Sequence, residues 1–233
     1  MSNKFYCVGV GPGDPELMSV KAQRIISENN NIAVPVRTPG QDPFDVMSLR
    51  IASGVVDGLS EKNIIPILIP MSKDREQLAK AHENAAHEIE AYLKKGEDLV
   101  FLCLGDPSFY SSVSYLRTIV AEDGFETETV AGITSFSAAA ARLGIPLAEW
   151  DEKVHVVPTI HKAEDLDAVF AEDGTYILMK SGKGLDEVKA VLAKKGFRGY
   201  AVENCGLPNE HVYTNPDEIP DESGYFLLVI ARK

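Results

Sequence analysis

Short apolar runs alternate with segments of helical periodicity along most of this chain, and this alternation constrains the fold more than any other feature. Runs of strand length, bounded by Gly, Pro or Asp, occupy residues 4–10, 31–36, 64–69, 98–104, 126–130, 154–157, 176–179, 200–203 and 225–231. Apolar residues recur at helical spacing between many of them, for example in residues 15–29, 73–95, 134–143 and 184–193. The pattern predicts an α/β protein with largely parallel sheets covered by helices.

The length of the chain, 233 residues, allows two domains of ordinary size. A polar stretch at residues 121–125 interrupts the pattern, and a new series of strands and helices begins after it. We therefore expect an N-terminal α/β domain of residues 1–121 and a C-terminal α/β domain of residues 122–233. From His211 onward, a short strand, a Pro-rich turn and a final strand suit an antiparallel edge or hairpin, which predicts a mixed sheet in the second domain.

The charge of the chain argues against several classes of partner. Its 35 acidic and 23 basic residues give a formal charge of -12, and no run of Lys and Arg exceeds two residues, so a nucleic-acid ligand is not expected. No apolar run approaches the ~20 residues of a membrane helix, and the polar start leads directly into a strand-like run. We expect a cytoplasmic protein without a membrane partner.

The sequence gives no signal for a metal or a disulfide. Cys7, Cys103 and Cys205 are odd in number and form no Cys-x-x-Cys pair, so small apolar fillers are the expected role. His82 and His87 lie on the long charged helical segment with Glu83, Glu88 and Glu90 nearby, which indicates a solvated helix face rather than a metal site. No metal is expected.

The first strand ends in a glycine-rich loop, Gly9-Val-Gly-Pro-Gly-Asp-Pro15. Asp14 can cap a following helix that has Pro15 at its first position. A dinucleotide fingerprint would need a third glycine at position 14, and a carboxylate there also disfavours a phosphate ligand. Taken alone, this loop favours a tight strand-to-helix turn over a binding site.

Two further loops at strand ends have the same character. Gly105-Asp106-Pro107 follows an apolar strand, and the residues 131–135 follow the strand at 126–130. Asp106 alone is as compatible with a helix cap as with a ligand contact. Ligands of open α/β sheets gather at the carboxyl ends of strands. Because these loops contain small residues, hydroxyls and carboxylates but no Lys or Arg, they suit a ligand that carries hydroxyls, an amine or a positive centre.

Five motifs follow one another in the order known from one enzyme family. They are the residues 9–17, 104–116, 131–146, 178–180 and 202–204, and they span essentially the whole chain. With them the chain resembles the tetrapyrrole methyltransferases, the S-adenosylmethionine-dependent family of corrin and sirohaem synthesis. Within that family, Gly-Asp-Pro-Ser-Phe-Tyr-Ser-Ser at 105–112 resembles the precorrin-2 C20-methyltransferase branch.

The resemblance implies two α/β domains with mixed sheets flanked by helices, the cofactor S-adenosyl-L-methionine in the cleft between them, and a homodimer. This cofactor has a sulfonium, an ammonium and ribose hydroxyls but no phosphate, which agrees with the loop chemistry. The family's cofactor contacts correspond to Pro12, Leu104, Gly105, Asp106, Phe109, Thr134, Ser135, Met179 and Cys205, where relatives often have glycine at the position of Cys205.

The resemblance further implies methylation of C20 of precorrin-2, or of cobalt-precorrin-2, in cobalamin biosynthesis. The expected substrate contacts are Asp14, Tyr110, Arg142 and Lys180. Since precorrin-2 carries eight carboxylates, we expect a basic rim to which Arg37 and Lys183 also contribute. The sequence identifies no catalytic residue; Asp14, Tyr110 and His155 are hypotheses for a base that removes the meso proton.

Two alternatives remain open at the level of sequence. One is a sister methyltransferase that acts at another ring carbon or on uroporphyrinogen III. The other is a non-catalytic protein that binds S-adenosylmethionine or a tetrapyrrole. A Rossmann dehydrogenase is a weaker third, because the fingerprint spacing fails at Asp14.

Overall fold

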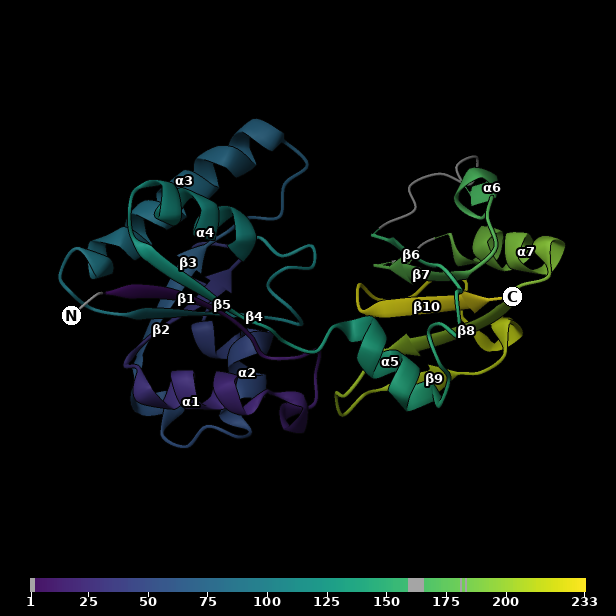
Figure 1. The fold of residues 1–233 in the computed structure, drawn as a ribbon, viewed down its shortest axis with the longest axis horizontal. Helices are drawn as coiled ribbons and strands as arrows, with labels where there is room; N and C mark the ends of the chain where they lie inside the picture. Colours follow the sequence, from purple (N-terminus) through teal and green to yellow (C-terminus); the bar gives the residue numbers. More distant parts are fainter. Residues whose placement is uncertain (1–2, 159–165, 181, 183) are drawn as a thin grey trace. The chain divides into compact units, whose positions relative to one another are not determined.

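The computed structural model of this chain describes residues 3–158, 166–180, 182 and 184–233 (Figure 1). The chain divides into two compact units, one ending at Thr134 and the other beginning at Ser135. Each unit is built around its own five-stranded sheet. The structure therefore confirms an α/β protein with two sheets flanked by helices.

The first unit contains a fully parallel sheet with the strand order β3-β2-β4-β1-β5. Its strands are β1 (Lys4–Gly9), β2 (Asn31–Val36), β3 (Asn63–Leu68), β4 (Leu99–Cys103) and β5 (Glu126–Val130). Every residue of the central strand β4 is buried, as expected for a strand with helices on both faces.

Helices cover both faces of this sheet (Figure 1). On one face the core includes side chains of α1 (Val20–Glu28) and α2 (Met47–Ser53). On the other it includes side chains of α3 (Arg75–Leu93) and α4 (Val113–Glu122). Three short 3-10 helices complete the unit: η1 (Pro15–Leu17), η2 (Pro43–Asp45) and η3 (Leu59–Glu61).

The helical segment expected at 15–29 is divided in two, because it contains two capping residues. Asp14 accepts a hydrogen bond from the Glu16 N–H and begins η1, while Ser19 accepts one from the Ala22 N–H and begins α1. The predicted cap at Asp14 with Pro15 after it is thus confirmed, but it begins only a short turn. The turn keeps the glycine-rich loop at the end of β1 separate from α1.

The connections of the first sheet diverge between its two central strands. From β1 the chain passes through α1 to β2, toward the β3 edge of the sheet. From its neighbour β4 the chain passes through α4 to β5, at the opposite edge. Such a switch point opens a crevice at the carboxyl ends of the two strands, where open α/β sheets bind ligands. The first two loops singled out in the sequence therefore lie side by side at this edge.

The expectation of a solvated histidine and glutamate face on α3 is wrong for two of its members. His82 and Glu90 are buried, whereas His87, Glu83 and Glu88 are exposed. The reason is that α3 packs against α4 as well as against the sheet: the His82 ring stacks on the Tyr115 ring of α4 with centroids 4.9 Å apart. Two contact surfaces widen the buried stripe of the helix.

The second unit contains a mixed sheet with the strand order β6-β7-β10-β8-β9. Its strands are β6 (Val154–Val157), β7 (Thr175–Met179), β8 (Arg198–Glu203), β9 (His211–Tyr213) and β10 (Leu227–Arg232). β6 and β7 are parallel, and the other neighbouring strands are antiparallel. One face packs on α5 (Ser135–Leu143), and the other on α6 (Leu166–Val169) and α7 (Leu185–Lys195), with η5 (Pro216–Glu218) before the last strand.

The last strand differs from its expected place. β10 is antiparallel, as predicted, but it lies between β7 and β8 rather than at an edge, and it does not pair with β9. Five of its six residues are buried. A strand with so continuous an apolar run is stabilised by neighbours on both sides and helices on both faces.

The division between the units falls thirteen residues after the boundary expected at 121. The cause is β5, which pairs in parallel with β1 from Lys4–Glu126 to Val8–Val130 and so completes the first sheet. The loop that follows β5 therefore belongs to the first unit, together with the loops after β1 and β4.

Among the residues that the structure describes, no helix combines the length and the apolar character that crossing a membrane requires.

Candidate functional site

The three loops singled out in the sequence meet at one edge of the first sheet. The Gly11 N–H donates to the Gly105 carbonyl at 3.3 Å, and the Gly105 N–H donates back to the Gly11 carbonyl at 2.8 Å. This antiparallel bridge joins the two loops directly beyond the parallel pairing of β1 and β4. Gly11 and Gly105 both have positive φ, 79° and 71°, which glycine adopts at no steric cost.

Three glycines hold the backbones of these loops in direct contact. A methyl group on Gly132 would lie 2.1 Å from the Gly105 carbonyl oxygen and 2.9 Å from the Gly9 Cα. A methyl group on Gly9 would lie 2.6 Å from the same oxygen. We call Gly9, Gly105 and Gly132 the glycine junction. Only residues without a side chain allow the ends of β1, β4 and β5 to approach this closely.

The carboxylate of Asp106 ties the junction together. Its Oδ2 accepts a hydrogen bond from the Gly132 N–H at 2.8 Å, and its Oδ1 accepts from the Ser108 N–H at 2.8 Å and from the Ser108 hydroxyl. Asp106 is 9% exposed. Both of its oxygens accept hydrogen bonds from the loops, so its side chain positions the site, and its predicted contact with the cofactor stays a prediction.

The predicted cofactor residues of the first unit lie on these joined loops. Pro12 is half-buried after β1, and Leu104, Gly105 and Phe109 are half-buried after β4. Thr134 follows the junction residue Gly132 by two positions. The structure therefore brings the first-unit part of the prediction together at the carboxyl edge of the sheet, although the sequence did not single out Gly9 and Gly132 as site residues.

The predicted substrate residues of the first unit flank the same edge. Asp14 is half-buried and caps η1. Tyr110 is exposed, has a φ of 48°, and packs edge-on against Phe109 with ring centroids 5.2 Å apart. A positive φ in a bulky residue is strained, and such strain is common at functional sites. Arg37 donates to the Ile69 carbonyl at 3.2 Å, after β2.

In the second unit, the predicted cofactor residues lie around one cluster. Met179 ends β7, Cys205 follows β8, and both pack against the buried residues that join α5 to the sheet. Ser135 begins α5. The residues directly after the two strands, Lys180 and Asn204, have positive φ values of 57° and 53°. Strand ends and strained backbone therefore coincide here as well.

The end of β8 has a further tie that the sequence did not reveal. Oε1 of Glu203 accepts hydrogen bonds from the Ser223 hydroxyl and, at 3.1 Å, from the Gly224 N–H. The Ser223 N–H in turn donates to the Gly182 carbonyl at 2.8 Å. The motif Val202-Glu-Asn204 pointed to this place, but the partners at 223 and 224 carried no signal of their own.

The two predicted basic substrate residues of the second unit have partners within it. Arg142 forms an ion pair with Glu210, which also accepts a hydrogen bond from the Gly206 N–H at 2.8 Å. The Lys180 ammonium lies 5.4 Å from the centre of the Tyr225 ring. Lys183, expected in the basic rim, lies outside the described residues. Contacts of any of these residues with a ligand stay predictions, as does the cleft between the domains.

His155, one of the three hypotheses for a base, lies within β6 rather than on a strand-end loop. Its ring stacks on the Tyr176 ring with centroids 4.5 Å apart, and its Nε2 is buried without a hydrogen-bond partner among the described residues. This position is typical of a packing role.

Comparison with known proteins agrees with this arrangement. Residues 4–219 match the family model of the Tetrapyrrole (Corrin/Porphyrin) Methylases. A probable cobalt-precorrin-2 C(20)-methyltransferase of Methanocaldococcus jannaschii is 39% identical over 82% of this chain and 78% of its own length. A precorrin-2 C(20)-methyltransferase of a Sinorhizobium species is 28% identical over 96% of this chain and 93% of its own.

A solved structure shares the fold. The uroporphyrin-III C-methyltransferase of Thermus thermophilus, complexed with S-adenosyl homocysteine, has a TM-score of 0.67 and 20% identity and covers 99% of this chain and 92% of its own. The family model extends over nearly the whole chain, and the motifs that it spans carry the loops of the site. This chain belongs to the tetrapyrrole (corrin/porphyrin) methylase family.

Proposed function

We propose that this chain is an S-adenosyl-L-methionine-dependent C-methyltransferase that methylates C20 of precorrin-2 or cobalt-precorrin-2 in cobalamin biosynthesis. The observation that carries the proposal is the match to relatives named for this reaction, at 39% identity over 82% of the chain. The branch motif at 105–112 lies in the loop between β4 and α4, which contains the junction residue Gly105 and binds Gly132 through Asp106. The most specific part of the sequence thus coincides with the centre of the candidate site.

The residues at the junction fit this cofactor. The loops at 9–14, 104–110 and 131–135 contain no Lys or Arg, so nothing in them repels a sulfonium or an ammonium group. The glycines let the main chain approach a ligand closely. We assign main-chain contacts to Leu104, Gly105 and Thr134, with Pro12 and Phe109 as apolar walls. Ser135, Met179 and Cys205 are the proposed contacts on the second unit. The cofactor supplies an activated methyl group.

Methyl transfer needs alignment more than acid or base catalysis. C20 of the tetrapyrrole attacks the methyl carbon in line with the breaking carbon–sulfur bond, whose electron pair leaves with the sulfur. The meso proton is lost afterwards. Holding two reactants in line and excluding water contributes most of the acceleration in such a step. Close-packed backbone at the ends of β1, β4 and β5 is suited to that task, because direct main-chain contacts leave the loops little room to move.

The substrate residues are proposed on charge. Precorrin-2 carries eight carboxylates, and Arg142 and Lys180 are basic residues beside the loops of the second unit. Arg142 donates to Glu210 through Nε and its side chain is exposed, so its other guanidinium N–H groups can bind a substrate carboxylate. Asp14 and Tyr110 are proposed contacts to the polar rim of the ring from the first unit. A homodimer, implied by the family resemblance, and a cytoplasmic location, expected from the sequence, belong to the same proposal; light scattering distinguishes one chain from two.

The proposed activity predicts one methylated product. Purified protein incubated with methyl-labelled S-adenosylmethionine is expected to methylate precorrin-2 or its cobalt complex at C20, and the position of the label is read by NMR. A label at another carbon, or turnover of uroporphyrinogen III alone, would identify a sister enzyme instead. If no product forms in a single turnover while calorimetry still detects bound S-adenosylhomocysteine, the protein is a binding protein.

The cysteines predict a simple footprint of the cofactor. Burial raises the pKa of the Cys103 thiol to about 12 and raises that of Cys7 further, whereas Cys205 is half-buried. Since the thiolate is the reactive form, native protein at pH 8 is expected to show one fast thiol per chain with an aromatic disulfide reagent. S-adenosylhomocysteine should slow this reaction at least tenfold.

A matched variant makes this footprint specific. Cys205→Ser should remove the fast phase and leave the slow reaction of the other two thiols unchanged. If the fast phase persists in that variant, or if the ligand binds without slowing it, Cys205 is not a cofactor contact.

A further inference from the structure

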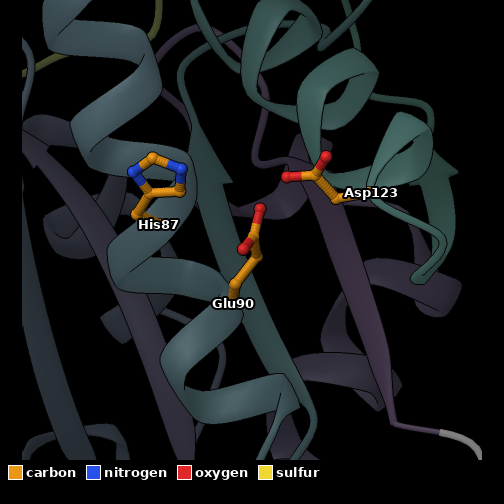
Figure 2. A group of neighbouring side chains, drawn as sticks. All are labelled: His87, Glu90 and Asp123. Atoms are coloured by element: carbon orange, nitrogen blue, oxygen red, sulfur yellow. The ribbon is translucent and has the colours of Figure 1, made fainter.

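A histidine and two carboxylates come together on the first unit, away from the loops described above. Figure 2 shows Glu90 on α3 between His87, one turn earlier on the same helix, and Asp123 at the end of α4. One ligand atom from each residue lies within 4.8 Å of the others. His87 and Glu90 are three positions apart, the spacing that places two side chains on one helix face.

Glu90 is the unusual member of this cluster. The residue is 2% exposed, and its Oε1 is buried without a hydrogen-bond partner among the described residues. Its Oε2 accepts from the Lys94 ammonium at 2.9 Å, which satisfies only one of the two oxygens. A buried carboxylate oxygen without a partner is costly, and here a second carboxylate lies close to it. Both features favour a cation beside this oxygen.

The helix ends add to this demand for a cation. Glu90 lies in the last turn of α3, and Asp123 is the C-cap of α4. The carbonyl ends of helices carry partial negative charge and favour cations, so carboxylates there are unfavourably placed. Neither helix has a basic residue in its last turn. Of the two C-cap residues, Lys94 of α3 is basic and Asp123 of α4 is acidic.

We propose that His87, Glu90 and Asp123 bind one divalent transition-metal ion of the zinc class, with water as a further ligand. An imidazole nitrogen and two carboxylate oxygens are established zinc ligands. Neighbouring ligand atoms in a tetrahedral zinc site are about 3.3 Å apart, given metal–ligand distances of about 2.0 to 2.1 Å. The exposed His87 and Asp123 side chains can close the remaining gap by rotation, whereas the buried Glu90 stays in place.

The position of the site indicates a structural role. The end of α3 leads into the start of β4, and the end of α4 leads into the start of β5. The cluster therefore lies at the amino edge of the sheet, opposite the glycine junction. A metal ion there would link two helices that are joined in sequence only through β4 and its loop, so it would stabilise the first unit without touching the reaction.

Zinc binding to the tag-free, chelator-treated full chain tests this proposal. We expect one equivalent of Zn²⁺ by calorimetry, and visible absorption bands of Co²⁺ that Zn²⁺ displaces. At a free zinc concentration about 100 times Kd, the unfolding temperature should rise by about 5 to 10 °C. His87→Gln, Glu90→Gln and Asp123→Asn should each weaken binding at least tenfold, which lowers the thermal shift at the same zinc concentration by about half or more.

Glu88→Gln is the matched control, because it removes the same charge from an exposed position on the same helix. It should bind zinc like the unchanged protein. Glu90→Gln alters a buried group and could prevent folding. In that case the two exposed variants, His87→Gln and Asp123→Asn, decide the test. The proposal is overturned if the unchanged protein does not bind one equivalent of zinc. It is also overturned if His87→Gln and Asp123→Asn bind zinc as tightly as the unchanged protein does.

Discussion

Replacing Gly132 with alanine is expected to weaken S-adenosylhomocysteine binding about 100-fold or more and to destabilise the first unit by about 2 to 3 kcal/mol. The added methyl group would lie 2.1 Å from the Gly105 carbonyl oxygen and 2.9 to 3.0 Å from the Gly9 backbone, closer than Cβ atoms ordinarily approach other atoms. These are main-chain atoms of two central strands, so no side-chain rotation relieves the clash. The loops must separate, and the main-chain groups that contact the ligand are then displaced from their binding positions.

Calorimetry with S-adenosylhomocysteine and unfolding in urea measure the two effects. Gly96→Ala is a suitable control, because Gly96 has a φ of 82° and nothing within 4 Å of an added methyl group. It should cost about 1 to 2 kcal/mol through backbone strain alone and change the ligand Kd less than twofold. If Gly132→Ala binds the ligand as well as Gly96→Ala does, the glycine junction is not part of the cofactor site.

Local sequence patterns were sufficient for the strands. β2, β5 and β6 have the predicted bounds, because apolar runs flanked by turn residues have few alternative structures. The partners of a strand are set by contacts far away in the chain. Nothing in residues 126–130 shows that they pair with β1 rather than begin a new sheet, and the final strand gave no sign that it would lie between β7 and β8.

The candidate site shows the same division between what is local and what is not. The strand-end loops were recognisable from glycine, aspartate and proline, and the structure joins the three loops of the first unit. The role of Asp106 was not recognisable, since one of its partners, Gly132, is 26 positions away. In the same way, the burial of Glu90 follows from α4, which packs on α3 from a later part of the sequence. Helical periodicity alone placed Glu90 on the solvent face.

Asp106→Asn is expected to destabilise the first unit by about 2 to 3 kcal/mol and to weaken S-adenosylhomocysteine binding at least tenfold. Asparagine retains the shape of aspartate but has only one acceptor oxygen. If the asparagine oxygen faces the Gly132 N–H, the asparagine NH2 group faces the Ser108 N–H. If the amide is turned around, the NH2 group faces the Gly132 N–H instead. Either orientation leaves a backbone donor unpaired at a site that is 9% exposed.

Ser108→Ala tests whether the effect comes from the hydrogen bonds between Asp106 and the backbone N–H groups of the loops, or from the loss of any hydrogen bond at this site. It removes only the hydroxyl that donates to Asp106 and keeps the backbone bonds of both Ser108 and Gly132, so a cost of about 1 kcal/mol and an almost unchanged Kd are expected. Urea unfolding and calorimetry on both variants give the comparison. Should Asp106→Asn lose binding at full stability, the carboxylate would contact the ligand itself. If Asp106 acts by holding the loops together, stability and ligand affinity should be lost together, because the same hydrogen bonds position the backbone and hold the strands.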